Sequence, residues 1–185
     1  AADQLAATQD ALSVNFLIAI ALCYLLLVAI FTHWGYPLLI MTTIPLGVAG
    51  GILGLWLMNA VGGLLPLVGL APLVQPFDMI AMLGFLILMG TVVNNPILIV
   101  HQAMTNLREG GMDATEAVRD AVETRLRPIA MSTLTTVFGL APLVFLPGAG
   151  AELYRGVGAI VLFGVLGTAG VALTFLPALT LIVLR

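Results

Sequence analysis

Five apolar runs of membrane-spanning length divide this chain. They cover residues 12–32, 37–60, 78–103, 126–146 and 156–184. A helix needs about 20 mostly apolar residues to cross the hydrocarbon core of a bilayer. Of all residues, 61% are hydrophobic and 8% are charged, whereas about a quarter are charged in a soluble domain. The sequence therefore predicts an all-α integral membrane bundle of about five transmembrane helices.

Arginines set the predicted orientation of this bundle. Four of the six basic residues fall in the polar stretch 104–127, namely Arg108, Arg119, Arg125 and Arg127. Cytoplasmic loops carry an excess of Lys and Arg, so we expect this stretch and Arg185 inside the cell, and Arg155 on an external loop. The N-terminus is then outside and the C-terminus cytoplasmic. Trp34 and Tyr36, in the turn between the first two runs, suit the membrane interface.

The polar stretch contains a short amphipathic pattern within a connector at about 104–125. Asp113 is the predicted helix N-cap, with Glu116 at capping-box spacing, and the helix is expected to reach Glu123. Its apolar stripe consists of Ala114, Ala117, Val118, Ala121 and Val122. We expect this segment on the membrane surface or against the bundle. It is either a plain connector or an element that couples motions.

The domain organisation follows from the same pattern. Residues 1–11 lack a starting Met and a basic signal-peptide region, and are expected to be an external lead-in from a missing periplasmic region. Residues 12–185 are expected to form one five-helix half-domain.

Several classes of function do not fit the sparse polar residues. A net charge of −3 offers no basic surface for nucleic acid. His33, His101 and Cys23 are isolated, so no metal site is expected. No nucleophile–base pair, phosphate loop or dinucleotide motif occurs, and the sequence predicts that the chain is not an enzyme.

A pair of amides stands near the middle of the third run. Asn94 and Asn95 are followed by Pro96, which leaves the carbonyl of Val92 without its helical donor and predicts a local weak point. Polar side chains inside a membrane are costly and often functional. The two amides could also only join helices by hydrogen bonds.

A second polar line begins at the fourth run. Ser132 and Thr136 lie seven and eleven positions after Arg125, so the three residues share one helix face. Arg125 could form the base of a functional face, or extend to the headgroups. Thr133 and Thr135 could simply bond backbone carbonyls. Apart from Asp78 at the external start of the third run, no carboxylate lies inside the runs, so a proton-driven function would need acidic residues from elsewhere.

Glycines recur at four-residue spacing in the second run. Gly47 pairs with Gly51, and Gly50 pairs with Gly54. Small residues at this spacing let another helix approach closely. We expect a packing surface there.

Longer motifs resemble a known family. The run GTVVNNPILIVHQAMTNLREGG, followed by DATEAVRDAVETRLRPIAMSTLTTVFGLAPLVFLPGAGAELYRGVGAIV, resembles the C-terminal membrane half of resistance-nodulation-division (RND) efflux transporters of the hydrophobe/amphiphile type. THWGYPLLIMTTIPLGVAGGILGLWL is similar to the hairpin between that family's eighth and ninth spans. The resemblance covers nearly all of residues 12–185. It implies that the five runs correspond to the eighth to twelfth spans of a subunit with twelve spans.

The resemblance implies a proton-driven exporter of drugs or other amphiphiles in the bacterial inner membrane. Its expected partners are the N-terminal half of the same transporter, further copies in a homotrimer, a periplasmic adaptor, an outer-membrane channel and the lipid bilayer. No cofactor is expected, because the proton gradient supplies the energy.

The resemblance also implies roles for the polar residues. In this family, paired aspartates of the fourth span face a lysine on the tenth span and an arginine and a threonine on the eleventh. By the local motifs, Asn94 stands at the lysine, Arg125 at the arginine and Ser132 at the threonine. The implied proton-relay wall comprises Asn94, Asn95, Arg125, Ser132 and Thr136. Since Asn carries no charge, hydrogen bonds would replace the lysine–aspartate ion pair.

Two alternatives fit parts of the sequence. One is a non-transporting packing or assembly module that associates through the glycine faces. The other is a protein-secretion accessory of the same superfamily. The motifs around Asn94 and Arg125 favour the exporter.

Overall fold

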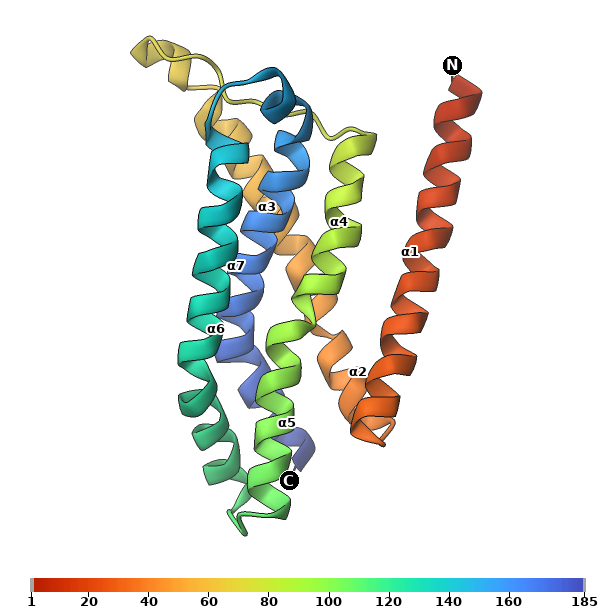
Figure 1. Cartoon of the computed structure of the whole chain (residues 1–185), viewed down its shortest axis with the longest axis vertical. Helices are drawn as coiled ribbons and strands as arrows, with labels where there is room; N and C mark the ends of the chain where they lie inside the picture. Colours follow the sequence, from red (N-terminus) through yellow and green to blue (C-terminus); the bar gives the residue numbers. More distant parts are fainter. Residues whose placement is uncertain (1, 185) are drawn as a thin grey trace.

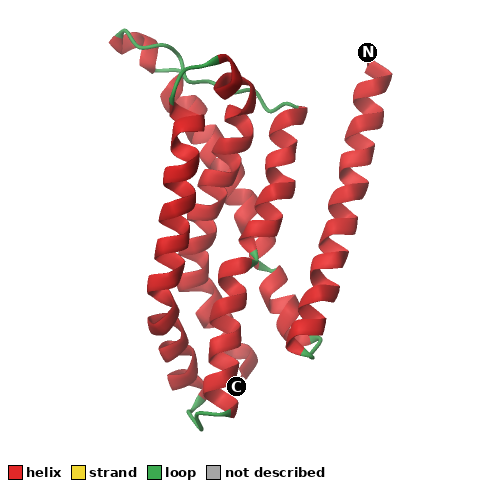
Figure 2. Cartoon of the chain, viewed as in Figure 1, coloured by secondary structure: helices red, strands yellow, loops and turns green. Residues whose placement is uncertain are grey.

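The computed structural model describes residues 2–184, so the expected position of Arg185 lies outside the described residues. Within this part the chain is helical, with loops and no strand (Figure 2). The helices form one elongated bundle, and the first and last described residues lie at opposite ends of it (Figure 1).

The helical elements have the following bounds in chain order: α1 Ala2–Phe31, α2 Gly35–Met41, α3 Thr43–Gly62, the 3-10 turn η1 Leu65–Val68, α4 Met79–Val92, α5 Asn94–Arg108, α6 Ala114–Phe145 and α7 Ala149–Leu184. Since α3 continues α2 and α5 continues α4, the described residues contain five helical stretches long and apolar enough to cross a membrane. The predicted all-α bundle of five transmembrane helices is confirmed.

Helix α7 forms the centre of the bundle, with α3, α4 and α6 packed around it (Figure 1). Helix α1 lies to one side, and its two buried residues, Leu27 and Phe31, are near its C-terminal end. Its first residues, expected as a lead-in, are helical from Ala2 onward. Hydropathy does not predict this extension, because it marks only the apolar residues of a span. The extension forms because Ala, Gln and Leu favour a helix whether or not it lies in a membrane.

Prolines divide two of the five spans. Pro45, in the first turn of α3, lacks the N–H that would bond the carbonyl of Met41 at the end of α2. Two hydroxyls bond carbonyls of the preceding turn: Thr42 Oγ1 donates to Leu39 O at 2.6 Å, and Thr43 Oγ1 to Ile40 O at 2.6 Å. These bonds satisfy polar groups where the regular ladder is interrupted.

The weak point predicted before Pro96 is confirmed. The expected third span is two helices, because α4 ends at Val92 and α5 begins at Asn94. Figure 2 shows the short break between them about halfway along the bundle. Asn94 and Asn95 thus start a helix in the middle of the protein.

The connector at about 104–125 differs from the prediction in two ways. Its amphipathic segment is continuous with the fourth span in the single 32-residue helix α6, since its helix-forming residues lead directly into the apolar run. Asp113 is at the N-cap, but its side chain makes no capping hydrogen bond, so the predicted capping box is wrong. The apolar stripe packs into the bundle, with Ala117, Val118 and Ala121 buried.

The sequence predicted Arg155 on an external loop, but the structure places this residue in a helix. Helix α7 begins at Ala149, before this residue, and the side chain of Arg155 is 7% exposed. Its Nη2 donates to the carbonyl oxygen of Leu146 at 3.4 Å. Most of the glycine-rich GAGAE segment, residues 148–152, forms the first turn of this helix.

Asp78 caps α4 and gives a testable contrast with Asp113. Its Oδ1 accepts a hydrogen bond from Ala81 N at 2.7 Å, which satisfies a free donor of the first turn. We expect Asp78→Ala to destabilise the protein by about 1 kcal/mol, measured by thermal unfolding in detergent. Asp113→Ala is the control, because Asp113 makes no such bond. Equal losses in both variants would contradict the capping role.

Candidate functional site

Helix α5 carries polar residues on two different faces. At 100° per residue, Asn95, Gln102 and Asn106 fall within about 40° of one line. Asn95 and Asn106 are buried, at 6% and 8% exposed, and Gln102 is half-buried. Asn94 lies on the neighbouring face together with His101, and both are exposed. The structure thus separates the two asparagines, one facing inward and one outward.

Arg125 binds the inward face of α5. Its Nη2 donates to Gln102 Oε1 at 2.9 Å, and its side chain is half-buried. The Nε atom is buried and has no hydrogen-bond partner among residues 2–184. One donor of the guanidinium is therefore held by α5, and another is buried within the bundle without a partner.

From Gln102 the hydrogen bonds continue toward the start of α6. Gln102 Nε2 donates to Asn106 Oδ1 at 3.0 Å. Asn106 Nδ2 donates to Asp120 Oδ2 at 2.7 Å and to the carbonyl oxygen of Ala117 at 3.2 Å. Sequence reasoning missed Gln102, Asn106 and Asp120. The only sequence signal was the four-residue spacing of the two amides beside an arginine-rich segment.

The predicted hydroxyl line on α6 is partly exposed. Ser132 is exposed and Thr136 half-buried, and Thr136 Oγ1 donates to the carbonyl oxygen of Ser132 at 3.0 Å. Thr133 Oγ1 is buried without a partner in the described part of the chain. No hydrogen bond within residues 2–184 joins Arg125 to Ser132, Asn94 or Asn95.

Helix geometry places the exposed polar groups at similar depths. Both α4 and α6 have an end at the top of Figure 1, at Met79 and Phe145 respectively. A rise of 1.5 Å per residue puts Asn94 about 22 Å from Met79, and Ser132 about 20 Å from Phe145. Arg125 lies about 30 Å from Phe145, a distance equal to the thickness of a bilayer core.

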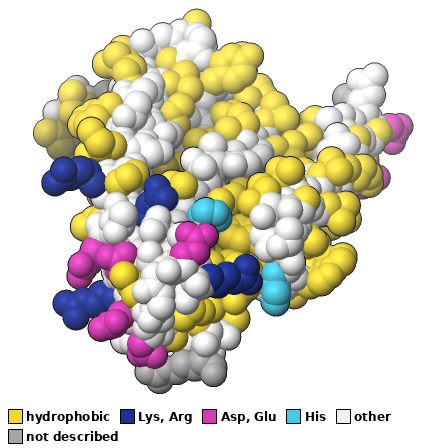
Figure 3. All heavy atoms as spheres, turned by 60° about the horizontal axis from the view of Figure 1, so that its bottom comes forward, with side chains coloured by type: hydrophobic (Ala, Val, Ile, Leu, Met, Phe, Trp, Pro, Cys, Tyr) yellow, Lys and Arg dark blue, Asp and Glu magenta, His cyan; other side chains and the backbone are white. Residues whose placement is uncertain are grey.

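Charged side chains gather at the end of the bundle that carries the connection between α5 and α6 (Figure 3). Arg119 and Glu123 form an exposed ion pair there, with Nε and Oε1 3.2 Å apart. No group of three or more potential metal-ligating side chains occurs within residues 2–184.

The glycine face of α3 lies against α7. Gly47, Gly51 and Gly54 are buried. A Cβ atom built on Gly51 would lie 3.2 Å from the carbonyl oxygen of Ile160, and one on Gly50 would lie 3.6 Å from Gly167 Cα. These glycines therefore contact a helix of the same chain.

Comparison with known proteins agrees with this architecture. A family model described as the AcrB/AcrD/AcrF family matches residues 1–184. The chain belongs to this family. The resemblance to RND efflux transporters is therefore confirmed, and the chain is a member of a family of efflux transporters.

Relatives are much longer than this chain. It is 37% identical over 150 residues to the multidrug resistance protein MdtC of Edwardsiella ictaluri, covering 81% of this chain and 13% of that protein. It is 33% identical over 157 residues to MdtC of Escherichia coli O1:K1, covering 85% and 14% respectively. The structure of a heavy metal efflux pump superposes with a TM-score of 0.76 at 25% identity, covering 98% of this chain and 16% of that one.

Proposed function

We propose that this chain is part of the membrane domain of a proton-driven exporter of drugs or other amphiphiles. In this proposal residues 12–185 form the C-terminal five-helix half of that domain. Arg125, Asn94, Asn95, Ser132 and Thr136 form one wall of its proton path. The curated relatives at 33% to 37% identity carry the name multidrug resistance protein, which favours amphiphiles over metal ions.

Arg125 carries the proposal. A buried arginine donor without a partner is costly, and a carboxylate is the group that a guanidinium binds best. Apart from Asp78, the first residue of the third run, no carboxylate lies inside the five predicted apolar runs. We therefore propose that acidic residues of the N-terminal half bind the exposed part of the Arg125 side chain, which is only half-buried in this bundle.

Exposed amide and hydroxyl groups support the same arrangement. Asn94 and Ser132 are exposed on neighbouring helices at similar depth, although polar groups facing lipid are unfavourable. A second half-bundle that covers them would supply hydrogen-bond partners. Asn94 cannot titrate, so in this proposal protons are carried by carboxylates opposite this wall.

The packing-module alternative has less support. Gly47, Gly51 and Gly54 are already buried against helices of this chain, so they are not free to bind another protein.

By the same proposal the transporter is a homotrimer in the bacterial inner membrane. It works with a periplasmic adaptor and an outer-membrane channel. Its connection between α5 and α6 is cytoplasmic and the start of α1 is external.

Reconstitution of the complete transporter in liposomes tests the energy source. With an imposed pH gradient and no nucleotide, we expect ethidium or another amphiphilic dye to move toward the acidic compartment, followed by fluorescence. A protonophore should stop this movement, and liposomes without protein provide the baseline. Dye movement that requires ATP and ignores the gradient would contradict the proposal.

A further inference from the structure

A continuous set of hydrogen bonds joins Arg125 to Asp120 across the contact between α5 and α6. Its four members are Arg125, Gln102, Asn106 and Asp120, and we refer to them as the amide chain. The three bonds measure 2.9, 3.0 and 2.7 Å between donor and acceptor atoms. Two neutral amides thus connect a cation near the membrane edge with an anion on the first turns of α6.

The charges at the two ends determine the orientation of both amides. A guanidinium only donates, so Gln102 must present its oxygen to Arg125. An ionised carboxylate only accepts, so Asn106 must present its nitrogen to Asp120. The remaining nitrogen of Gln102 then faces the remaining oxygen of Asn106, as observed. Each bond has one donor and one acceptor, and reversing either amide would place like groups together.

Burial distinguishes the amide chain from an ordinary surface network. Asn106 is 8% exposed and also donates to the carbonyl oxygen of Ala117. Gln102, Arg125 and Asp120 are half-buried. By contrast, the side chains of Arg119 and Glu123 on the same helix are 80% and 68% exposed, and such pairs contribute little. Hydrogen bonds to charged groups in a less polar environment are stronger and polarise one another.

We infer that Gln102, Asn106 and Asp120 are positioning residues for Arg125. They hold its Nη2 against α5, while the exposed part of the half-buried side chain is open to a partner outside this half-bundle. Asp120 provides the negative charge that keeps the amides oriented toward the guanidinium. This inference rests on the proposed role of Arg125, and it adds a specific dependence of that role on a carboxylate at the cytoplasmic end of α6.

Neutralising Asp120 tests this inference in the complete transporter. Asp120→Asn keeps the shape of the side chain but removes its charge. We expect the maximal export rate per transporter molecule to fall about tenfold, with the half-saturating dye concentration unchanged. Asp120→Glu should retain most of the rate, because it restores the carboxylate. Glu123→Gln, which removes an exposed carboxylate three residues away, should leave the rate unchanged.

A second variant covers the case in which Asp120→Asn does not accumulate in membranes. Gln102→Leu removes the acceptor of Arg125 at similar volume, and we expect a comparable fall in rate. Wild-type rates in Asp120→Asn and Gln102→Leu, with Arg125→Ala inactive, would overturn the positioning role of the amide chain. They would leave the proposed proton path intact. A wild-type rate in Arg125→Ala as well would overturn the proposed path itself. Failure of Asp120→Glu to restore the rate would also contradict the charge requirement.

Discussion

Substitution Arg125→Ala is expected to reduce export by the complete transporter at least a hundredfold, at unchanged expression. The change removes the proposed cation of the proton path and leaves Gln102 Oε1 without its donor. A hydrogen bond to a charged group contributes about 1.5 to 3 kcal/mol, and about 2.7 kcal/mol corresponds to a hundredfold change in rate. Dye efflux from cells, normalised to transporter amount by immunoblot, measures the effect.

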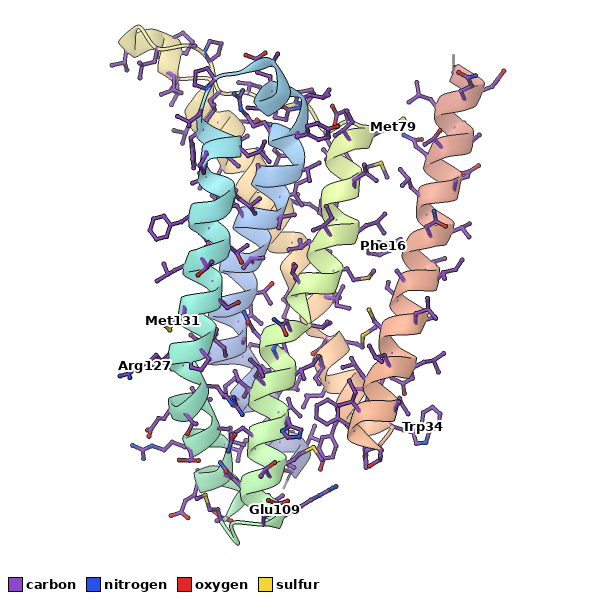
Figure 4. All side chains as sticks on the ribbon, in the orientation of Figure 1. Phe16, Trp34, Met79, Glu109, Arg127 and Met131 are labelled. Carbon is purple, nitrogen blue, oxygen red and sulfur yellow. The ribbon has the colours of Figure 1, made fainter. Side chains whose placement is uncertain are left out.

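Arg127→Ala is the matched control for this experiment. Arg127 is two residues further along α6, is exposed, and its side chain points away from the other helices (Figure 4). The variant removes the same charge from the same end of the protein, and we expect nearly wild-type export. Arg125→Lys should fall between the two, since lysine keeps the charge but loses the planar set of donors.

Two results would contradict the role of Arg125. Normal export by Arg125→Ala would exclude a place for Arg125 in the proton path. An equal loss in Arg125→Ala and Arg127→Ala would point to a general effect of positive charge on membrane orientation.

The membrane fold could be predicted because the bilayer imposes a length on every apolar run. Where helices continue beyond the bilayer, that signal disappears. Helix α1 extends to Ala2, α6 begins at Ala114 and α7 at Ala149, all before the apolar runs that they contain. Hydropathy indicates which residues lie in the bilayer, whereas the ends of a helix depend on backbone hydrogen bonds and on capping residues. The break at Val93 was predictable because proline has a fixed local effect.

The candidate site could be predicted only in part. Motifs marked Asn94, Asn95, Arg125 and Ser132, yet spacing along the chain could not show that Asn95 is buried while Asn94 is exposed. That difference depends on which face of α5 packs against neighbouring helices. The amide chain was missed for a related reason, because Asn106 and Asp120 meet only after α5 and α6 pack together. Polar residues in a connecting segment outside the apolar runs are usually solvated, so their pattern did not indicate a buried network.

Gly54→Ala is expected to have the largest effect on stability among single-methyl additions on the glycine face. A Cβ atom there would overlap Cβ of Phe163 on α7. The position of that Cβ is fixed by the α7 backbone, so a rotamer change of Phe163 cannot relieve the overlap and α3 must move away from α7. Overpacking of this kind costs about 1 to 3 kcal/mol, which exceeds the gain of about 1 kcal/mol from replacing a helical glycine by alanine.

Two other glycines separate overpacking from backbone effects in the same measurement. Gly50, also on α3, has its nearest neighbours 3.6 Å from the added Cβ, and Gly90 on α4 has no atom within 4 Å. Because neither substitution creates a close contact, we expect Gly50→Ala and Gly90→Ala to be neutral or stabilising. Thermal unfolding in detergent, followed by circular dichroism, should therefore show a lowered melting temperature for Gly54→Ala alone. A melting temperature for Gly54→Ala equal to that of Gly90→Ala would mean that α3 and α7 do not pack as closely as the structure places them.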